Sequence, residues 1–121
     1  MNSEKAFSLY IQRVRYFNLK SRCPELCVAH FIEASLLLAR CYEKEQCLLL
    51  QELFLRRTFY DLLNKYCDPL QTQRLRKQCL DQMYKPLLAL KRFYSRHDGS
   101  NKKYLKLVQE MRVLSHEFNP Y

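Results

Sequence analysis

The fold is decided by residues 24–66, PELCVAHFIEASLLLARCYEKEQCLLLQELFLRRTFYDLLNKY, which contain no glycine and, after Pro24, no proline. Proline fits the first position of a helix, and nothing after it interrupts a helical pattern. One continuous helix would be about 64 Å long, whereas a compact chain of this size has a radius of gyration of about 14 Å. We therefore expect an antiparallel helical hairpin with its turn in the polar run Glu43–Gln46. A single long helix is the alternative.

The rest of the chain favours helices for the same reason. Its 121 residues include one glycine, Gly99, four prolines and no tryptophan. Glycine supplies the positive φ that hairpin turns, bulges and close approach to a ligand require. The glycine-rich motifs of nucleotide-binding folds and the GxSxG motif of hydrolases are absent from the sequence. We expect a single all-α domain that is not an enzyme and binds no cofactor and no small-molecule substrate.

Apolar residues recur at helical spacing outside the hairpin as well. Ser3 is a candidate N-cap for the first helix. Asp68 is expected to cap a helix that begins at Pro69, and Pro86 is expected to interrupt it. Residues 97–101 have the composition of a loop. The predicted fold is a compact bundle of five or six helices over residues 3–20, 24–42, 46–66, 69–85, 87–96 and 101–118.

The hairpin carries more apolar surface than a small domain can hide. Polar residues of its first arm fall in one narrow stripe, and its second arm is apolar on nearly every side. Exposed apolar faces of this kind mark protein interfaces. We expect a non-catalytic interaction module, a small subunit or adaptor of a nuclear or cytoplasmic complex, that binds a protein partner. The candidate partner-binding residues are Leu37, Leu38, Leu49, Leu50, Leu53 and Phe54.

Most of the net charge of +9 lies in the second half of the chain. Residues 1–68 hold 10 basic and 8 acidic side chains, whereas residues 69–121 hold 11 and 4. Lysine and arginine attract phosphates, and exposed aromatic rings stack on unpaired bases. A nucleic-acid-binding domain is therefore the alternative function, and a solvated basic face is the other interpretation of the pattern. The candidate residues are Arg74, Lys77, Lys85, Lys91, Arg92, Arg96, Lys102, Lys103 and Lys106.

Four of the six cysteines lie close together in the sequence, with one histidine among them. The group consists of Cys23, Cys27, His30, Cys41 and Cys47. These side chains include the ligands that zinc prefers, but their spacing is not that of a common zinc finger. We predict buried thiols and no metal site. The C-x3-C and C-x5-C spacings also resemble the twin C-x3-C hairpins of small mitochondrial intermembrane-space chaperones, which implies a bridged hairpin. The second pair departs from that pattern.

Leu9, Tyr10 and Ile11, followed by Arg13, resemble the motif of the small basic helical LYR proteins of mitochondria. Ile11 stands where the motif has its arginine. The resemblance implies a small mitochondrial helical assembly factor, which is a distant third function. Packing of Tyr10 in the core is the alternative interpretation of the same residues.

No stretch of the sequence is as long and apolar as a membrane-spanning helix, and residues 1–5 have no signal-peptide core. We expect a soluble intracellular protein without a membrane partner.

Overall fold

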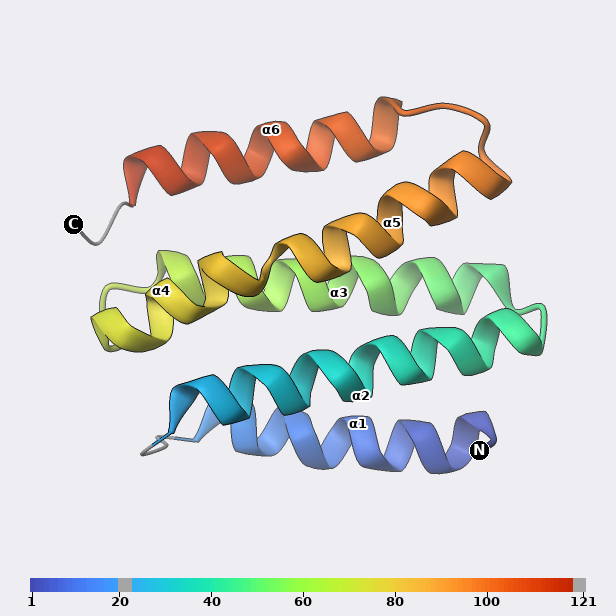
Figure 1. The fold of residues 1–121 in the computed structure, drawn as a ribbon, viewed down its shortest axis with the longest axis horizontal. Helices are drawn as coiled ribbons and strands as arrows, with labels where there is room; N and C mark the ends of the chain where they lie inside the picture. Colours follow the sequence, from blue (N-terminus) through green and yellow to red (C-terminus); the bar gives the residue numbers. More distant parts are fainter. Residues whose placement is uncertain (20–22, 119–121) are drawn as a thin grey trace.

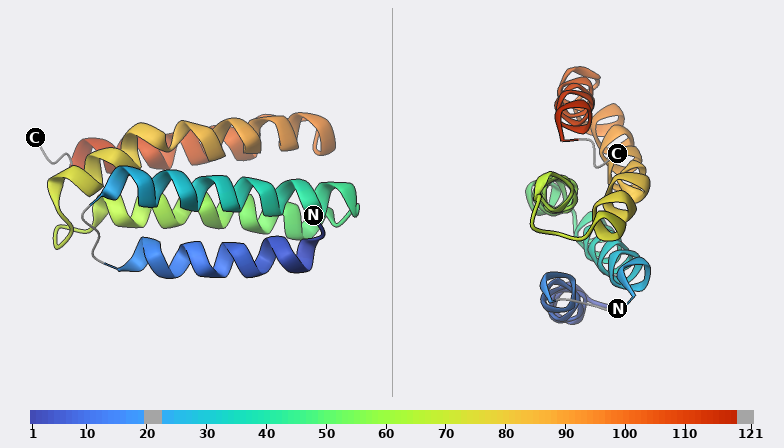
Figure 2. Two further views of the ribbon diagram at one scale, coloured as in Figure 1. Left: turned by 60° about the horizontal axis from the view of Figure 1, so that its bottom comes forward. Right: turned by 90° about the vertical axis from the view of Figure 1, so that its left-hand side faces the viewer.

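The computed structural model describes residues 1–19 and 23–118, which form six helices and contain no strand. The helices are α1 (Ser3–Asn18), α2 (Pro24–Lys44), α3 (Leu48–Cys67), α4 (Gln73–Gln82), α5 (Tyr84–His97) and α6 (Lys102–Glu117) (Figure 1). Figure 2 shows two layers in the end-on view, one made by α1, α3 and α6 and the other by α2, α4 and α5. The prediction of an all-α bundle is confirmed.

Helices α2 and α3 pack against each other as an antiparallel hairpin. The turn lies at residues 45–47, slightly later than predicted. Gln46 has a φ of 59°, in the left-handed region. The amide of Cys47 donates to the carbonyl of Tyr42 at 2.9 Å, and that of Gln46 donates to Glu43 at 3.0 Å. These are the two bonds of a Schellman motif, which usually has glycine where this chain has Gln46.

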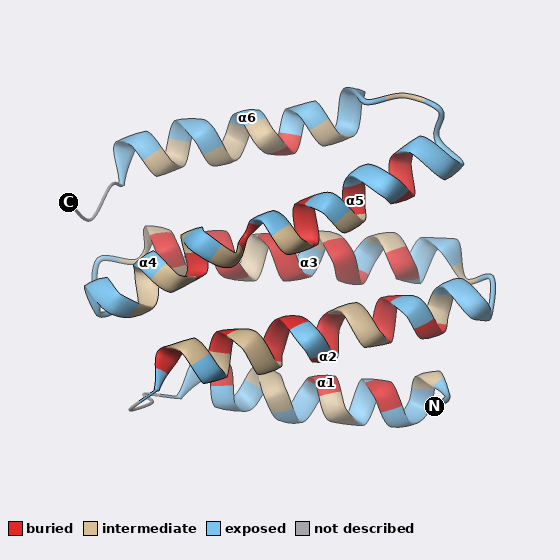
Figure 3. Cartoon of the chain, in the orientation of Figure 1, coloured by how far each residue is buried: buried red, intermediate tan, exposed pale blue. Residues whose placement is uncertain are grey.

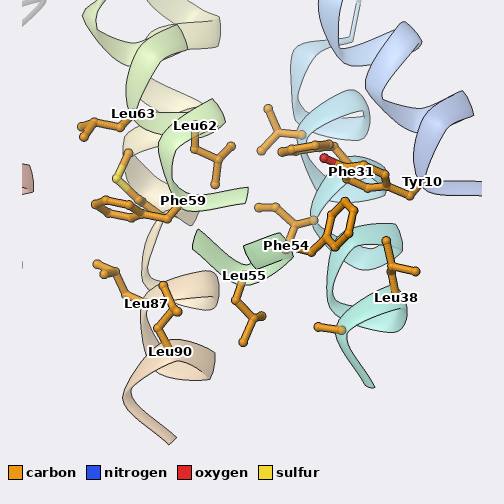
Figure 4. Close-up of a cluster of buried hydrophobic side chains, with 14 of the residues drawn as sticks. Tyr10, Phe31, Leu38, Phe54, Leu55, Phe59, Leu62, Leu63, Leu87 and Leu90 are labelled. Carbon is orange, nitrogen blue, oxygen red and sulfur yellow. The ribbon is translucent and has the colours of Figure 1, made fainter. Parts of the chain in front are cut away.

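The hydrophobic core lies between the two layers, and α3 contributes to it over its whole length. Figure 3 shows buried residues concentrated on α2, α3 and α5, and few on α6. The close-up in Figure 4 shows aromatic rings where α1, α2 and α3 meet, and mostly aliphatic side chains where α3 meets α5. The largest fully buried side chains are Tyr10, Tyr66, Tyr94, Phe31, Phe59, Ile32, Leu38, Leu62, Leu63, Met83, Leu90 and Leu107.

The predicted helix start at Pro69 is wrong. Asp68 ends α3, and its carboxylate accepts the backbone amide of Leu70 at 3.0 Å. This side-chain-to-backbone bond closes a local turn instead of capping a helix. Thr72 is the N-cap of α4, with its hydroxyl accepting the amide of Leu75 at 3.2 Å.

The predicted break at Pro86 is also misplaced. The two helices meet at Met83, and Pro86 is the third residue of α5. A proline in the first turn costs no helical hydrogen bond, because the amides there have no partner within the helix. Its ring would clash with the carbonyl four residues earlier, and α4 accordingly ends at that residue, Gln82.

The outer ends differ little from prediction. Asn2 is the N-cap of α1 in place of Ser3, since its side chain accepts the amide of Lys5 at 2.9 Å. The predicted end of this helix at residue 20 lies outside the described residues. Gly99 has a φ of 66°, and its amide donates to the carbonyl of Tyr94 at 3.0 Å in the turn after α5.

Candidate partner-binding surface

The structure divides the six predicted apolar residues into three groups by burial. Leu38 and Phe54 are buried in the core, so they are not available to a partner. They lie on the sides of α2 and α3 that face other helices, and the Phe54 ring packs edge-on against Tyr10 at 5.3 Å. Leu37 is half-buried. The remaining three, Leu49, Leu50 and Leu53, are exposed, and Leu49 keeps 79% of its surface.

Helix α1 adds two apolar side chains to this surface. Phe7 and Ile11 are exposed on α1. The ring of Phe7 lies 6.0 Å from that of Phe54, which follows Leu50 by one helical turn. Phe7 therefore lies close to the part of α3 that carries Leu50. We call Phe7, Ile11, Leu49, Leu50 and Leu53 the Leu–Phe patch.

Sequence reasoning missed Phe7 and Ile11, because they share a helical stripe with Tyr10. Tyr10 is buried, with its ring 6.2 Å from that of Phe31. The stripe is wider than the part that α2 covers, and α1 lies at the edge of its layer (Figure 2). Spacing alone could have identified both residues as apolar-face residues, but not as exposed ones.

Cations lie along one side of the Leu–Phe patch. The Nζ of Lys103 is 4.0 Å from the Oε2 of Glu52, which places the start of α6 beside the first turns of α3. Lys102 and Lys106 flank Lys103 on α6, are exposed, and form no ion pair within the described residues. Arg57 is exposed one turn beyond Leu53. The patch is thus bordered by positive charge toward α6 and farther along α3.

The acid nearest the patch is Glu52, next to Leu53, and it is paired with Lys103. Two further acids lie toward the hairpin turn. Glu45 is in the hairpin turn, and its carboxylate accepts the amide of Ser3 at 3.3 Å. Glu4 follows in the first turn of α1. Acids therefore lie at the hairpin turn and at Glu52, whereas Lys102 and Lys106 toward α6 form no ion pair within the described residues.

A groove of about 300 Å³ continues the patch between α1 and α3. Arg57, Asp61 and Lys65 line it from α3. Burial raises the pKa of the Asp61 carboxyl, an effect that the two cations partly oppose. Burial, reinforced by the charge of Asp61, also raises the pKa of Tyr10 to about 12. The hydroxyl of Tyr10 has no hydrogen-bond partner within the described residues.

The nine predicted basic residues are spread over three helices. Arg74 and Lys77 lie on α4, Lys85, Lys91, Arg92 and Arg96 on α5, and Lys102, Lys103 and Lys106 on α6. Several are engaged within the chain: Arg74 donates two hydrogen bonds to Glu25, at 2.7 and 2.8 Å. Arg96 donates to Glu43 at 2.8 Å, and Lys91 lies over the ring of Tyr104.

The aromatic residues of this half offer little surface for stacking on bases. Phe93 and Tyr94 are buried, and Tyr104 is half-buried beneath Lys91. Tyr84 is exposed, on the first turn of α5.

None of the six cysteines forms a disulfide bond, which does not match the bridged hairpin implied by the resemblance to the twin C-x3-C proteins. Cys41 and Cys79 are buried, and burial raises the pKa of Cys79 to about 12. Cys23 is exposed, and the other three are half-buried. Across residues 1–19 and 23–118, no three His, Cys, Asp or Glu side chains are grouped so that they could hold a metal ion.

Within the described part of the chain, none of the helices has an apolar stretch long enough to cross a bilayer.

These features define a small two-layer helical bundle whose exposed apolar patch lies on α1 and α3, with cations beside it. No protein-family model, no curated protein and no solved structure matches the chain. The assignment of a function therefore depends on the surface itself. Tyr10, which carries the resemblance to LYR proteins, packs between Phe31 and Phe54 in the core.

Proposed function

We propose that this chain is a non-catalytic protein–protein interaction module, a small subunit or adaptor of a nuclear or cytoplasmic assembly. Its partner is an acidic amphipathic helix that binds the Leu–Phe patch. The observation that carries the proposal is the exposure of Leu49 and Leu53, at 79% and 51%, beside the exposed Phe7 and Ile11. Single exposed apolar residues are ordinary, but several of them on two helices of one layer are typical of an interface.

The shape of the patch supports a helical partner. Leu49 and Leu53 are one turn apart on α3, and Phe7 and Ile11 are one turn apart on α1. Residues one turn apart form the ridges against which a partner helix packs, with its own apolar anchors at i, i+3, i+4 and i+7.

The charges support an acidic partner. Lys102, Lys103 and Lys106 border the patch toward α6, and the chain as a whole carries a net charge of +9. Charges at the rim of an interface act mainly on the association rate and on the choice of partner. A helix with glutamate beside its apolar stripe would therefore be selected over the same helix with lysine.

A pair of synthetic peptides tests the proposal by fluorescence anisotropy. Both are ~18 residues long, about five helical turns, with the same leucine stripe and either glutamate or lysine beside it. We expect the glutamate peptide to bind and the lysine peptide to bind at least tenfold more weakly. Leu53→Asp should weaken binding of the glutamate peptide at least tenfold, because burial of a leucine contributes about 1.5–3 kcal/mol and a buried unpaired carboxylate adds a further cost.

Val113→Asp is the matched control, because Val113 is 50% exposed on α6 and Leu53 is 51% exposed on α3. This variant should bind the glutamate peptide within twofold of wild type. Equal loss in the two variants, or equal binding of the two peptides, would contradict the proposal. Sedimentation would show whether a second copy of the chain covers the patch instead. In that case the wild type would be a dimer and Leu53→Asp would be a monomer.

Nucleic-acid binding by the basic second half is the weaker proposal, supported by Lys102 and Lys106, which form no ion pair within the described residues. A single-stranded oligonucleotide in the same assay would favour it only if its binding fell steeply with salt.

A further inference from the structure

A second hollow lies on the other layer, between α2 and α5, with α3 beneath it. It has a volume of about 290 Å³. Arg40 and Glu43 line it from α2, Gln51 from α3, and Arg92, Arg96 and His97 from α5. Leu36, Ala39, Leu55, Ala89 and Phe93 supply apolar lining. This volume is suited to a small molecule and not to a helix.

The charges of this hollow do not cancel. Three of its lining residues are arginines, and Glu43 is its one acid. That carboxylate is already occupied, since Arg96 donates to it at 2.8 Å and the Gln51 amide donates to it at 3.2 Å. Arg40 and Arg92 have no acidic partner within the described residues. Two positive charges are therefore left over, which matches a dianion.

Gln51 supplies a second polar feature. Its side chain is buried, and its carbonyl oxygen has no hydrogen-bond partner within the described residues. The assignment of its two amide atoms is fixed by chemistry, because the opposite orientation would set a carbonyl oxygen against the Glu43 carboxylate. An unpaired buried acceptor costs about 1–3 kcal/mol. A ligand hydroxyl that reached this oxygen would satisfy it.

The helix ends limit where an anion can lie. Both α2 and α5 end near this hollow, and the carbonyls of a helix C-terminus repel anions. Arg96 lies in the last turn of α5 and offsets that dipole. The effect fades beyond the last turn, and both Arg40 and Arg92 lie farther back. An anion is therefore best placed between these two arginines.

We propose that this hollow binds the phosphate group of a small, hydroxyl-bearing phosphate monoester. A phosphate monoester carries a charge of about −1.5 to −2 at neutral pH, and the planar fork of arginine matches its oxygens better than a lysine would. The organic part of the ligand packs against the apolar lining, and the side-chain oxygen of Gln51 accepts a hydrogen bond from a ligand hydroxyl. The site is independent of the Leu–Phe patch, which lies on the other layer.

Isothermal titration at low salt, with glycerol 3-phosphate, propyl phosphate and succinate as probes, tests the proposal. We expect saturable binding in the order glycerol 3-phosphate, propyl phosphate, succinate. Arg40→Gln and Arg92→Gln should each weaken the binding of glycerol 3-phosphate at least tenfold, which is the usual effect of losing a charged hydrogen bond. Gln51→Met should reverse the order of the first two probes, because it removes the acceptor and adds apolar surface.

Lys102→Gln is the control, since it removes one exposed charge on α6 and should change the affinity less than twofold. Both arginines are exposed, so their variants are expected to fold, and circular dichroism checks each one. Absence of saturable binding, or equal losses in Lys102→Gln and Arg92→Gln, would overturn the site. Succinate binding as tightly as the phosphates would overturn the ligand class. Tighter binding of a phosphoserine peptide than of glycerol 3-phosphate would overturn the assignment to a small molecule.

Discussion

Gln46→Gly should stabilise the protein, because Gln46 is held at a φ of 59° in the hairpin turn. A residue with a Cβ pays about 1–2 kcal/mol for the left-handed conformation, and glycine avoids this cost. Glycine also gives the unfolded chain more conformational freedom, which reduces the gain in the free energy of unfolding by about 0.5–1 kcal/mol. The net gain is about 0.5–1 kcal/mol. With an unfolding entropy of about 2.1 cal/mol/K per residue over 121 residues, the melting temperature rises by about 2–4 °C.

Thermal unfolding followed by circular dichroism measures this gain, with two controls. Gln46→Ala should melt with the wild type, because alanine also has a Cβ at the left-handed position. Lys44→Gly, in the last turn of α2, should melt lower, because glycine costs about 0.5–1 kcal/mol in a helix. The reasoning about the turn would be refuted if Gln46→Gly melted at or below the wild type.

Two further predictions concern burial. Leu38 is fully buried and Leu49 is 79% exposed, so Leu38→Ala should lower the free energy of unfolding by about 2–5 kcal/mol and Leu49→Ala should change it by less than about 0.5 kcal/mol in urea titrations. Because burial raises the pKa of Asp61 above its unfolded value, its ionised form costs stability above the folded pKa, and this cost is absent below the unfolded pKa. Asp61→Asn should therefore raise the melting temperature at neutral pH and lose that advantage near pH 3; a gain of the same size at both pH values would contradict the burial of the carboxyl.

The hairpin could be predicted from sequence because it depends on the lack of helix-breaking residues in one stretch: no glycine or proline follows Pro24 before Tyr66. The start of α4 could not, because aspartate before proline suits both an N-cap and a side-chain turn. The bond from Leu70 to Asp68, which decides between them, appears only in the folded chain.

Exposure was harder to predict than helix formation. Leu38 and Leu49 both belong to leucine-rich helical runs, yet one is in the core and the other faces solvent. Helical spacing gives the direction of a side chain around its own axis, but not the number of helices packed there. The hollow between α2 and α5 could not be predicted from the sequence for the same reason, since the packing of these two helices brings Arg40 and Arg92 to it.

The scarcity of glycine constrains how this chain can recognise anything, because phosphate-binding loops and tight backbone turns are largely closed to it. Recognition must come from side chains on helices, and α3 presents two different faces. Gln51 and Leu55 face inward toward the hollow, whereas Leu49 and Leu53 face outward. Sites on opposite sides of a rigid helix, with no shared contact, should act independently. Leu53→Asp should therefore leave the affinity for glycerol 3-phosphate within twofold, and Arg92→Gln should leave the affinity for the acidic peptide within twofold. A larger effect in either direction would mean that α3 moves when one of its faces is occupied.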